Sequence, residues 1–167
     1  MEGFVTQEQY WRELYALKTH ISFIELEIEN AVKIDRRLKV ILAIASSTSI
    51  GGWAIWQSYS MIWATVIAAS QVITAITPLL PYKTRIKQYS ALLGELESLM
   101  VHAEFKWNSI ASGKLTNEEI NKSRFEIASA KQKSIKKHIQ TTITTNVKSH
   151  RKAELAATEY FELYYNI

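Results

Sequence analysis

The chain of 167 residues contains no cysteine, so disulfides, thiolate metal sites and cysteine catalysis are excluded. The four histidines, His20, His102, His138 and His150, do not pair at any metal-binding spacing. The sequence also has no glycine-rich phosphate loop and no plausible Ser/His/Asp set. We therefore expect no catalytic residues, no metal and no cofactor, and we predict that the protein is not an enzyme.

Charge is missing from one long segment. The chain carries 20 Lys and Arg and 16 Asp and Glu, yet none of these, and no histidine, occurs in the 43 residues from Val40 to Tyr82. As one helix the segment would extend roughly 65 Å, about twice the ~30 Å hydrocarbon thickness of a bilayer. We therefore predict a transmembrane hairpin with spans at about 40–56 and 61–82 and a turn at 57–60. The alternative is a soluble protein that buries this hairpin, permanently or until it inserts as a pore-former.

The predicted hairpin divides the chain into three parts. Residues 1–39 form an N-terminal cytoplasmic amphipathic helix, residues 40–82 the hairpin, and residues 83–167 a C-terminal cytoplasmic helical region. Aromatic side chains favour the headgroup layer, and basic side chains mark the cytoplasmic side of a span. Because basic residues flank both outer ends and none lies in the turn, we expect both termini in the cytoplasm. The predicted interface anchors are Trp53, Trp56, Tyr59, Trp63, Tyr82, Arg36, Arg37, Lys39, Lys83 and Arg85.

Small and polar residues interrupt the predicted spans. Ala43, Ser47 and Gly51 recur every four residues, a row that lets helices approach closely in lipid. A second stripe contains Ser70, Thr74 and Thr77, with Gln71 beside it. Either the hydroxyls bond to their own helix while the small residues pack the spans together, or several hairpins surround a weakly polar lumen. The absence of intramembrane ionisable residues argues against a proton relay or an ion-coupled transporter.

Apolar residues at spacings of three and four flank the hairpin and predict two amphipathic helices. Such seams should pack against each other as an antiparallel coiled-coil stalk. A capping box at Thr6–Gln9 is expected to open the first helix. The first seam contains Tyr10, Leu14, Leu17, Ile21, Ile24, Ile28 and Ala31, and the second contains Ile86, Tyr89, Leu93, Leu96, Met100, Ala103, Trp107 and Ile110.

The remaining sequence predicts further helices. Ser112-Gly113-Lys114 should end the second helix, and a capping box at Thr116–Glu119 should open a third with apolar positions Ile120, Phe125, Ile127 and Ile135. The β-branched stretch "IQTTITTNVKSH" predicts a kink or a break. A last helix is expected at about 149–164, with apolar contacts from Ala153, Ala156, Ala157, Tyr160 and Leu163. The predicted fold class is therefore all-α: a two-span hairpin with a cytoplasmic helical bundle.

Basic residues are frequent on the third helix. We expect Lys131, Lys133, Lys136 and Lys137 to form a cytoplasmic basic face. Such a face can touch anionic lipid or nucleic acid, but glutamates on the same helix favour an ordinary solvated surface. Direct binding of nucleic acid is therefore not the favoured interpretation.

The layout resembles the SLATT proteins, two-transmembrane effector domains associated with SMODS nucleotidyltransferases and SLOG sensors in bacterial conflict systems. The features that carry the resemblance are "YWRELYALKTHISFIELEIENAV", the basic lead "RRLK", the aromatic turn "WQSYSMIW" and "PYKTRIKQYSALLGELESL". The resemblance covers nearly the whole chain but rests on architecture. A looser likeness is to the small pore-forming membrane accessory proteins of type VI-B CRISPR loci.

This resemblance implies a membrane-permeabilising effector of prokaryotic antiphage defence, located in the bacterial inner membrane and acting as a homo-oligomer. The sequence carries no recognisable nucleotide-binding or sensor domain, so the trigger is expected to be a separate sensor or defence protein. The alternative is a membrane adaptor that conducts nothing and tethers a soluble nuclease or sensor.

Overall fold

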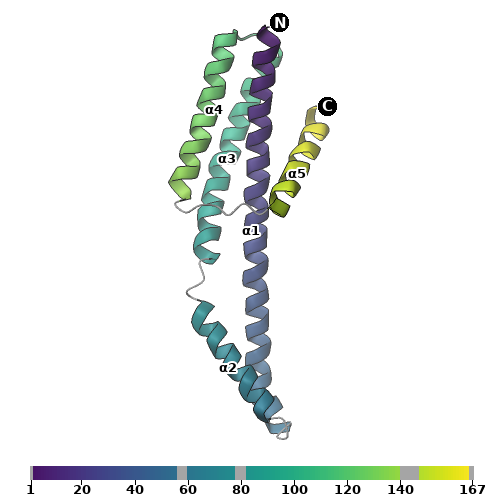
Figure 1. Ribbon diagram of the computed structural model, residues 1–167, viewed down its shortest axis with the longest axis vertical. Helices are drawn as coiled ribbons and strands as arrows, with labels where there is room; N and C mark the ends of the chain where they lie inside the picture. The colour runs from purple at the N-terminus through teal and green to yellow at the C-terminus, as the bar shows by residue number, and fades with distance from the viewer. Residues whose placement is uncertain (1, 56–59, 78–81, 140–146, 166–167) are drawn as a thin grey trace. The chain divides into compact units, whose positions relative to one another are not determined.

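A computed structural model describes residues 2–55, 60–77, 82–139 and 147–165 (Figure 1). These residues form helices and contain no strand, which confirms the all-α prediction. The helices are α1 (Glu2–Ile55), α2 (Ser60–Ile76), α3 (Tyr82–Ala111), α4 (Asn117–His138) and α5 (Val147–Tyr165).

The chain divides into two compact units. Met1–Ile28 and Lys87–Ile167 form the first, which we call the bundle unit, and Glu29–Ile86 form the second, which we call the hairpin unit. The divisions fall within α1 and within α3, so each of these long helices contributes to both units. The two units are described separately below.

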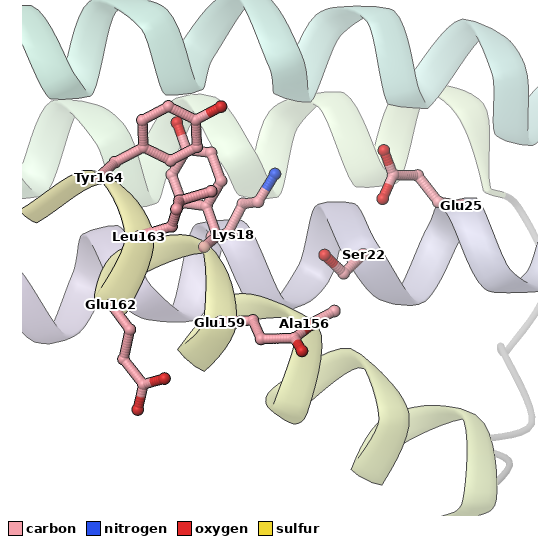
Figure 2. A pocket seen from close by; sticks show the side chains of 9 residues that line it. Lys18, Ser22, Glu25, Ala156, Glu159, Glu162, Leu163 and Tyr164 are labelled. Atoms are coloured by element: carbon pink, nitrogen blue, oxygen red, sulfur yellow. The ribbon is translucent and has the colours of Figure 1, made fainter.

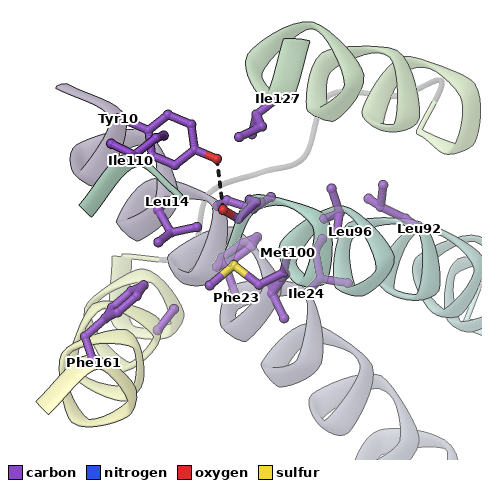
Figure 3. Packing of buried hydrophobic residues seen from close by; sticks show 14 of the residues in the cluster. Tyr10, Leu14, Phe23, Ile24, Leu92, Leu96, Met100, Ile110, Ile127 and Phe161 are labelled. Atoms are coloured by element: carbon purple, nitrogen blue, oxygen red, sulfur yellow. Dashed lines mark hydrogen bonds between the residues drawn. The ribbon is translucent and has the colours of Figure 1, made fainter. Parts of the chain in front are cut away.

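The bundle unit is built on the antiparallel pair that the two seams predict. The Tyr10 hydroxyl donates to the Ala103 carbonyl at 2.9 Å, and the Gln7 amide donates to the Ile110 carbonyl at 3.2 Å. Around these contacts the apolar side chains of α1 and α3 are buried together (Figure 3). The most deeply buried are Tyr10, Leu14, Leu17, Ile21, Ile24, Leu92, Leu96 and Ile110.

Several positions differ from the predicted seams. Leu92 is fully buried, whereas the predicted Leu93 is only partly buried beside the core. Phe125, predicted as an apolar contact of the third helix, is 72% exposed. Leu163 is 74% exposed, and the buried residue near it is Phe161. Which residues of a helix are buried therefore depends on which neighbouring helix covers them. Apolar spacing alone does not specify that neighbour.

Helix α5 packs through a row of small and aromatic residues. Ala153, Ala157 and Phe161 lie four residues apart, on one helix face, and are all buried. The Phe161 ring contacts Trp11 with ring centres 4.9 Å apart. The two alanines allow close approach of the helices, and the aromatic end of α5 supplies most of the apolar area.

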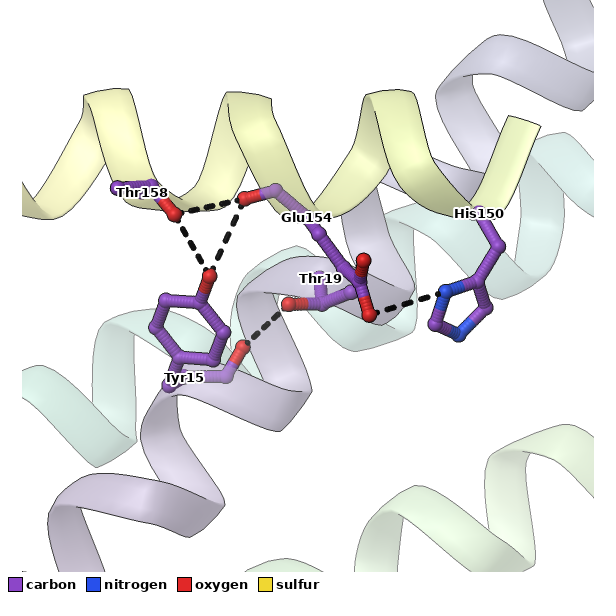
Figure 4. Close-up of polar contacts among 5 residues, drawn as sticks. All are labelled: Tyr15, Thr19, His150, Glu154 and Thr158. Atoms are coloured by element: carbon purple, nitrogen blue, oxygen red, sulfur yellow. Dashed lines mark hydrogen bonds and ion pairs between the residues drawn. The ribbon is translucent and has the colours of Figure 1, made fainter. Parts of the chain in front are cut away.

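A hydroxyl network joins α5 to α1 (Figure 4). The Tyr15 hydroxyl lies 2.7 Å from the Thr158 hydroxyl and donates to the Glu154 carbonyl at 3.2 Å. Thr158 also donates to that carbonyl, at 3.0 Å. Each such bond contributes roughly 0.5–1.5 kcal/mol, so the network fixes the register of α5 more than it adds to stability.

The helix ends follow local sequence signals in most places. Gly113 has a φ of 67°, and the Lys114 and Gly113 amides donate to the Ser109 and Ile110 carbonyls, so α3 ends in a Schellman motif at the predicted glycine. At the start of α4, the Thr116 hydroxyl accepts from the Glu119 amide and the Glu119 carboxylate accepts from the Thr116 amide, which confirms this capping box.

Two other boundary predictions have different outcomes. The capping box at Thr6–Gln9 is wrong, because α1 already begins at Glu2 and Thr6 lies inside the helix. The predicted break in "IQTTITTNVKSH" agrees with the helix ends. Helix α4 ends at His138, the next residue Ile139 has an extended backbone, and α5 begins at Val147. Residues 140–146 of this stretch lie outside the described residues.

Within the described ranges, no helix combines the length and the apolar character that crossing a membrane requires. Helix α2, which begins one residue before the predicted second span and ends at Ile76, contains 17 residues. The predicted turn at 57–60 lies outside the described residues except for Ser60, where α2 begins.

Candidate functional site

The hairpin unit exposes a large apolar surface. In α2 the side chains of Met61, Ile62, Val66, Ile67, Val72 and Ile76 are all exposed, Met61 at 82%. In α1, Val40, Ile41 and Ile44 are exposed as well. Fully burying an aliphatic side chain is worth roughly 1.5–3 kcal/mol, so such a surface favours an apolar partner.

The predicted polar stripe of α2 bonds to its own helix. The Ser70, Thr74 and Thr77 hydroxyls donate to the carbonyls of Ile67, Ser70 and Ile73 at 2.8, 2.8 and 2.6 Å. Thr65 does the same to Met61 at 2.9 Å. Each hydroxyl proton therefore has a partner without a second helix or water. The Gln71 side chain is exposed beside this stripe.

The predicted small-residue row lies on α1, where Ala43 is exposed. Ser47 and Gly51 belong to the same helix, but their surroundings lie outside the described part. Because these residues lie four apart in one helix, the row follows one face of α1.

The described interface anchors are distributed over α1, α2 and α3. Trp53 is in α1, Trp63 is in α2, and Tyr82 is the first residue of α3; their side chains lie outside the description, as do Trp56 and Tyr59 entirely. The basic anchors Arg36, Arg37, Lys39, Lys83 and Arg85 are exposed on α1 and α3.

The predicted basic face of α4 is divided between two sides of the helix. Lys131 is only 18% exposed and pairs with Glu13 of α1, so its assignment to a solvated face is wrong. Lys137 pairs with Glu95 of α3. Lys133 and Lys136 remain exposed, and Lys122 shares their side of the helix. Contacts with α1 and α3 decide which lysines of α4 are paired, because a helix that packs against its neighbours cannot turn every side to water.

Glu95 is the most heavily bonded carboxylate in the bundle unit. Its Oε1 accepts from the Lys137 ammonium and lies 2.9 Å from the His138 ring nitrogen. These bonds, with one from Ser134, lower the pKa of Glu95 to about 2. The carboxylate therefore stays ionised at any physiological pH and holds the end of α4 against α3.

Two histidines, from α1 and α5, lie near Phe23 of α1. The His20 ring lies 6.5 Å from the Phe23 ring, and Phe23 lies 6.2 Å from the His150 ring. His150 is 3.3 Å from Glu154 on its own helix. Burial lowers the pKa of His20, and the positive charge of Lys131 and the proximity of His150 lower it further. His20 is therefore neutral in the folded protein at pH 7.

The lowered pKa of His20 predicts that the bundle unit loses stability in mild acid. The unfolded chain binds a proton at His20 below pH about 6.5, whereas the folded chain resists it, so stability is complete above that pH and falls below it. We expect the urea midpoint of the full-length protein to fall between pH 7 and pH 5. The His20→Gln variant should show a smaller fall, and His102→Gln, at an exposed position, should behave like the unmodified chain. Equal pH dependence in all three would assign the effect elsewhere.

An open hollow of about 710 Å³ lies between α1 and α5 (Figure 2). Lys18 of α1 lies over the Tyr160 ring, with its Nζ 4.1 Å from the ring centre. Glu25, Glu159 and Glu162 surround the hollow, and Leu163 and Tyr164 line one side of it. The sequence analysis did not identify this site, because its residues come from helices more than 130 positions apart. The only sequence signal was glutamate alternating with apolar residues near the end of α5.

The floor of this region is tied to α3 by tyrosine hydroxyls. Tyr160 and Tyr165 both donate to Glu104, at 2.7 and 3.2 Å. Burial, with the nearby Glu104, raises the pKa of Tyr165 to about 12 and raises that of Tyr160 as well. Both hydroxyls therefore stay protonated and keep donating, which fixes the end of α5 against the bundle.

Among the residues that the structure describes, no group of three His, Asp or Glu side chains is arranged to hold a metal ion.

No protein-family model, curated protein or solved structure matches this chain.

Proposed function

We propose that the protein is a membrane-permeabilising effector of bacterial antiphage defence. Its hairpin unit enters the inner membrane, both termini stay in the cytoplasm, and several copies assemble around the breach. The observation that carries the proposal is the charge-free segment from Val40 to Tyr82, whose described side chains are largely apolar and exposed. The antiphage role rests on the resemblance to the SLATT proteins.

The bonding of the α2 hydroxyls supports lipid as the surroundings of this helix. A polar group in hydrocarbon needs an internal partner, and Ser70, Thr74 and Thr77 each have one within α2. The same hydroxyl oxygens keep free acceptor positions, so the stripe is also suited to border a weakly polar lumen.

The length of α2 bears on the mechanism. Its 17 residues correspond to roughly 26 Å of helix, slightly less than a ~30 Å hydrocarbon core. A short helix is accommodated when the bilayer thins around it or when several copies associate. Both responses weaken the barrier locally, which suits a protein that permeabilises rather than one that transports a selected ion.

The bundle unit supplies the part on which a trigger acts. In the proposed mechanism a separate sensor or defence protein binds the cytoplasmic helices and shifts the population from a closed to an open assembly. Such a partner must bind the open arrangement more tightly than the closed one, because only differential affinity moves the equilibrium.

Two measurements on the full-length protein test the proposal. We expect the protein to stay with the membrane pellet after alkaline carbonate extraction of cells. We also expect the purified protein to release a small dye from vesicles of phosphatidylethanolamine and phosphatidylglycerol. Extraction into the carbonate supernatant would rule out the inserted hairpin. Retention in the membrane with intact vesicles would instead indicate the non-conducting adaptor.

A further inference from the structure

The bundle unit carries two exposed surfaces of opposite charge on different helices. The first, which we call the α4 outer face, contains Lys122, Phe125, Lys133 and Lys136. The second, which we call the acidic hollow, is the hollow between α1 and α5 bordered by Glu25, Glu159, Glu162, Leu163 and Tyr164. We propose that the α4 outer face of one copy docks into the acidic hollow of a second copy of this chain.

The α4 outer face combines an exposed ring with free charge. Residues 122, 125, 133 and 136 lie on the side of α4 opposite the buried Ile120, Ser123 and Ile127. Phe125 is 72% exposed, an unusual position for a large aromatic side chain in water. Lys122, Lys133 and Lys136 have no ion-pair partner within the described residues, whereas Lys131, on the inner side, and Lys137, which is 63% exposed, are both paired.

The acidic hollow has the complementary character. Glu25, Glu159 and Glu162 are exposed and likewise have no ion-pair partner in the part of the chain that the structure describes. Among the described residues that line the hollow the cation is Lys18, and it lies over the Tyr160 ring. Leu163 and Tyr164, exposed at 74% and 66%, offer apolar contacts for an incoming ring (Figure 2). Three carboxylates beside apolar side chains thus complement three ammonium groups spread along the side of α4 that carries Phe125, where Glu118 is a further exposed charge.

The positions of the two surfaces require a second copy. Figure 1 shows α4 and α5 on opposite sides of α1. The inner side of α4 faces α1, through Lys131 and Glu13, so the outer face points away from the hollow of its own chain. A copy that docks its α4 outer face keeps its own hollow open for the next copy. Such head-to-tail contacts close into a ring or continue as a filament.

This contact would be an interface within the homo-oligomer of the proposed function. It rests on the proposed function only in taking the partner to be a second copy. Exposed charge pairs contribute little individually and are screened by salt. We therefore expect the charges to set the register and the choice of partner, while the Phe125 ring in the hollow provides most of the attraction.

The absence of cysteine makes a direct test possible. Ser129→Cys, at an exposed position on the α4 outer face, and Ala156→Cys, in the lining of the hollow, keep Phe125 and Leu163 in place. The two variants are prepared as separate full-length proteins in mild detergent, mixed, and treated with a short bis-maleimide. We expect a cross-linked dimer in the mixture and only background in either variant alone, because the proposed interface joins two different surfaces. A mixture of Ala156→Cys with Ser98→Cys, which lies at an exposed position on α3, serves as the control and should stay at background.

Charge reversal provides the second measurement. Lys133→Glu with Lys136→Glu, or Glu159→Lys with Glu162→Lys, introduced into the corresponding cysteine variant, should each lower the cross-linking yield about tenfold. Combining the two reversed proteins should restore it. Circular dichroism of each variant should match that of the parent, since all four positions are exposed.

Three results would overturn the proposal. The first is background cross-linking in the mixed proteins, and the second is equal cross-linking of Ser129→Cys with itself. The third is loss of binding to phosphatidylglycerol vesicles by Lys133→Glu with Lys136→Glu while its cross-linking is unchanged, which would assign the α4 outer face to a lipid surface. Cross-linking is measured in detergent and does not depend on membrane permeabilisation. If the protein released no dye from vesicles, the proposed function would fail while the docking of two copies would still be tested.

Discussion

Replacing Leu14 by alanine is expected to lower the free energy of unfolding of the bundle unit by about 2–5 kcal/mol. Leu14 is fully buried in the cluster formed by α1 and α3, next to Tyr10 along the helix face. The substitution removes the contacts made by three side-chain carbons, and it leaves a cavity that the neighbouring helices close only in part. A loss of this size is a large fraction of the 5–15 kcal/mol by which domains are typically stable.

The matched control is Leu163→Ala, the same change at a position that is 74% exposed. We expect it to alter the free energy of unfolding by less than about 0.5 kcal/mol. Urea unfolding of the full-length proteins in mild detergent, followed by circular dichroism, measures both values. If Leu163→Ala proved as costly as Leu14→Ala, the described packing of α5 would be wrong. The sequence pattern alone would have ranked the two leucines as equals.

The success of the seam prediction has a simple physical origin. Tyr10, Leu14, Leu17, Ile21 and Ile24 alternate at spacings of four and three, and all five are buried, because this spacing keeps one face of a helix towards its neighbour. The helix ends at Gly113 and Thr116 were also predictable. They depend on interactions within a few residues, so the local sequence contains all the relevant information.

Features set by contacts between distant residues could not be predicted in the same way. Lys131 and Lys133 look alike in the sequence, yet one pairs with Glu13 of α1 and the other is exposed. Nothing near position 131 reveals a carboxylate more than a hundred residues away. The acidic hollow was missed for the same reason, since Glu25 and Glu159 meet only when α5 packs on α1.

The apolar surface of the hairpin unit was predictable in part from the sequence. The absence of charge from Val40 to Tyr82 is read directly from the sequence, and it singles out the same apolar residues that the structure finds exposed. The helix lengths were less predictable: α2 ends at Ile76, before Pro78 and Pro81, whereas the predicted second span continued to Tyr82. Proline cannot donate its backbone nitrogen to a helix, so the two prolines favour an end near this point.

A single charge in α2 should abolish permeabilisation if the proposed function is correct. Val66 lies near the middle of α2, is exposed, and belongs to the apolar surface of the hairpin unit. A lysine at the centre of an inserted helix costs about 3 kcal/mol on the scale derived from membrane insertion. In an assembly of several hairpins every copy bears this cost. We therefore expect Val66→Lys to reduce dye release from phosphatidylglycerol-containing vesicles at least about a hundredfold at equal protein concentration.

Two control variants separate this effect from a general loss of structure or a change in net charge. Val66→Leu keeps the position apolar and should release dye at the parental rate. Thr84→Lys adds the same charge at an exposed position just beyond the hairpin, among Lys83 and Arg85, where contact with anionic headgroups tolerates or favours it. If Val66→Lys and Thr84→Lys released dye equally, α2 would not enter the hydrocarbon. Any leakage would then arise from basic residues acting at the membrane surface, and the apolar face of α2 would be left to bind protein.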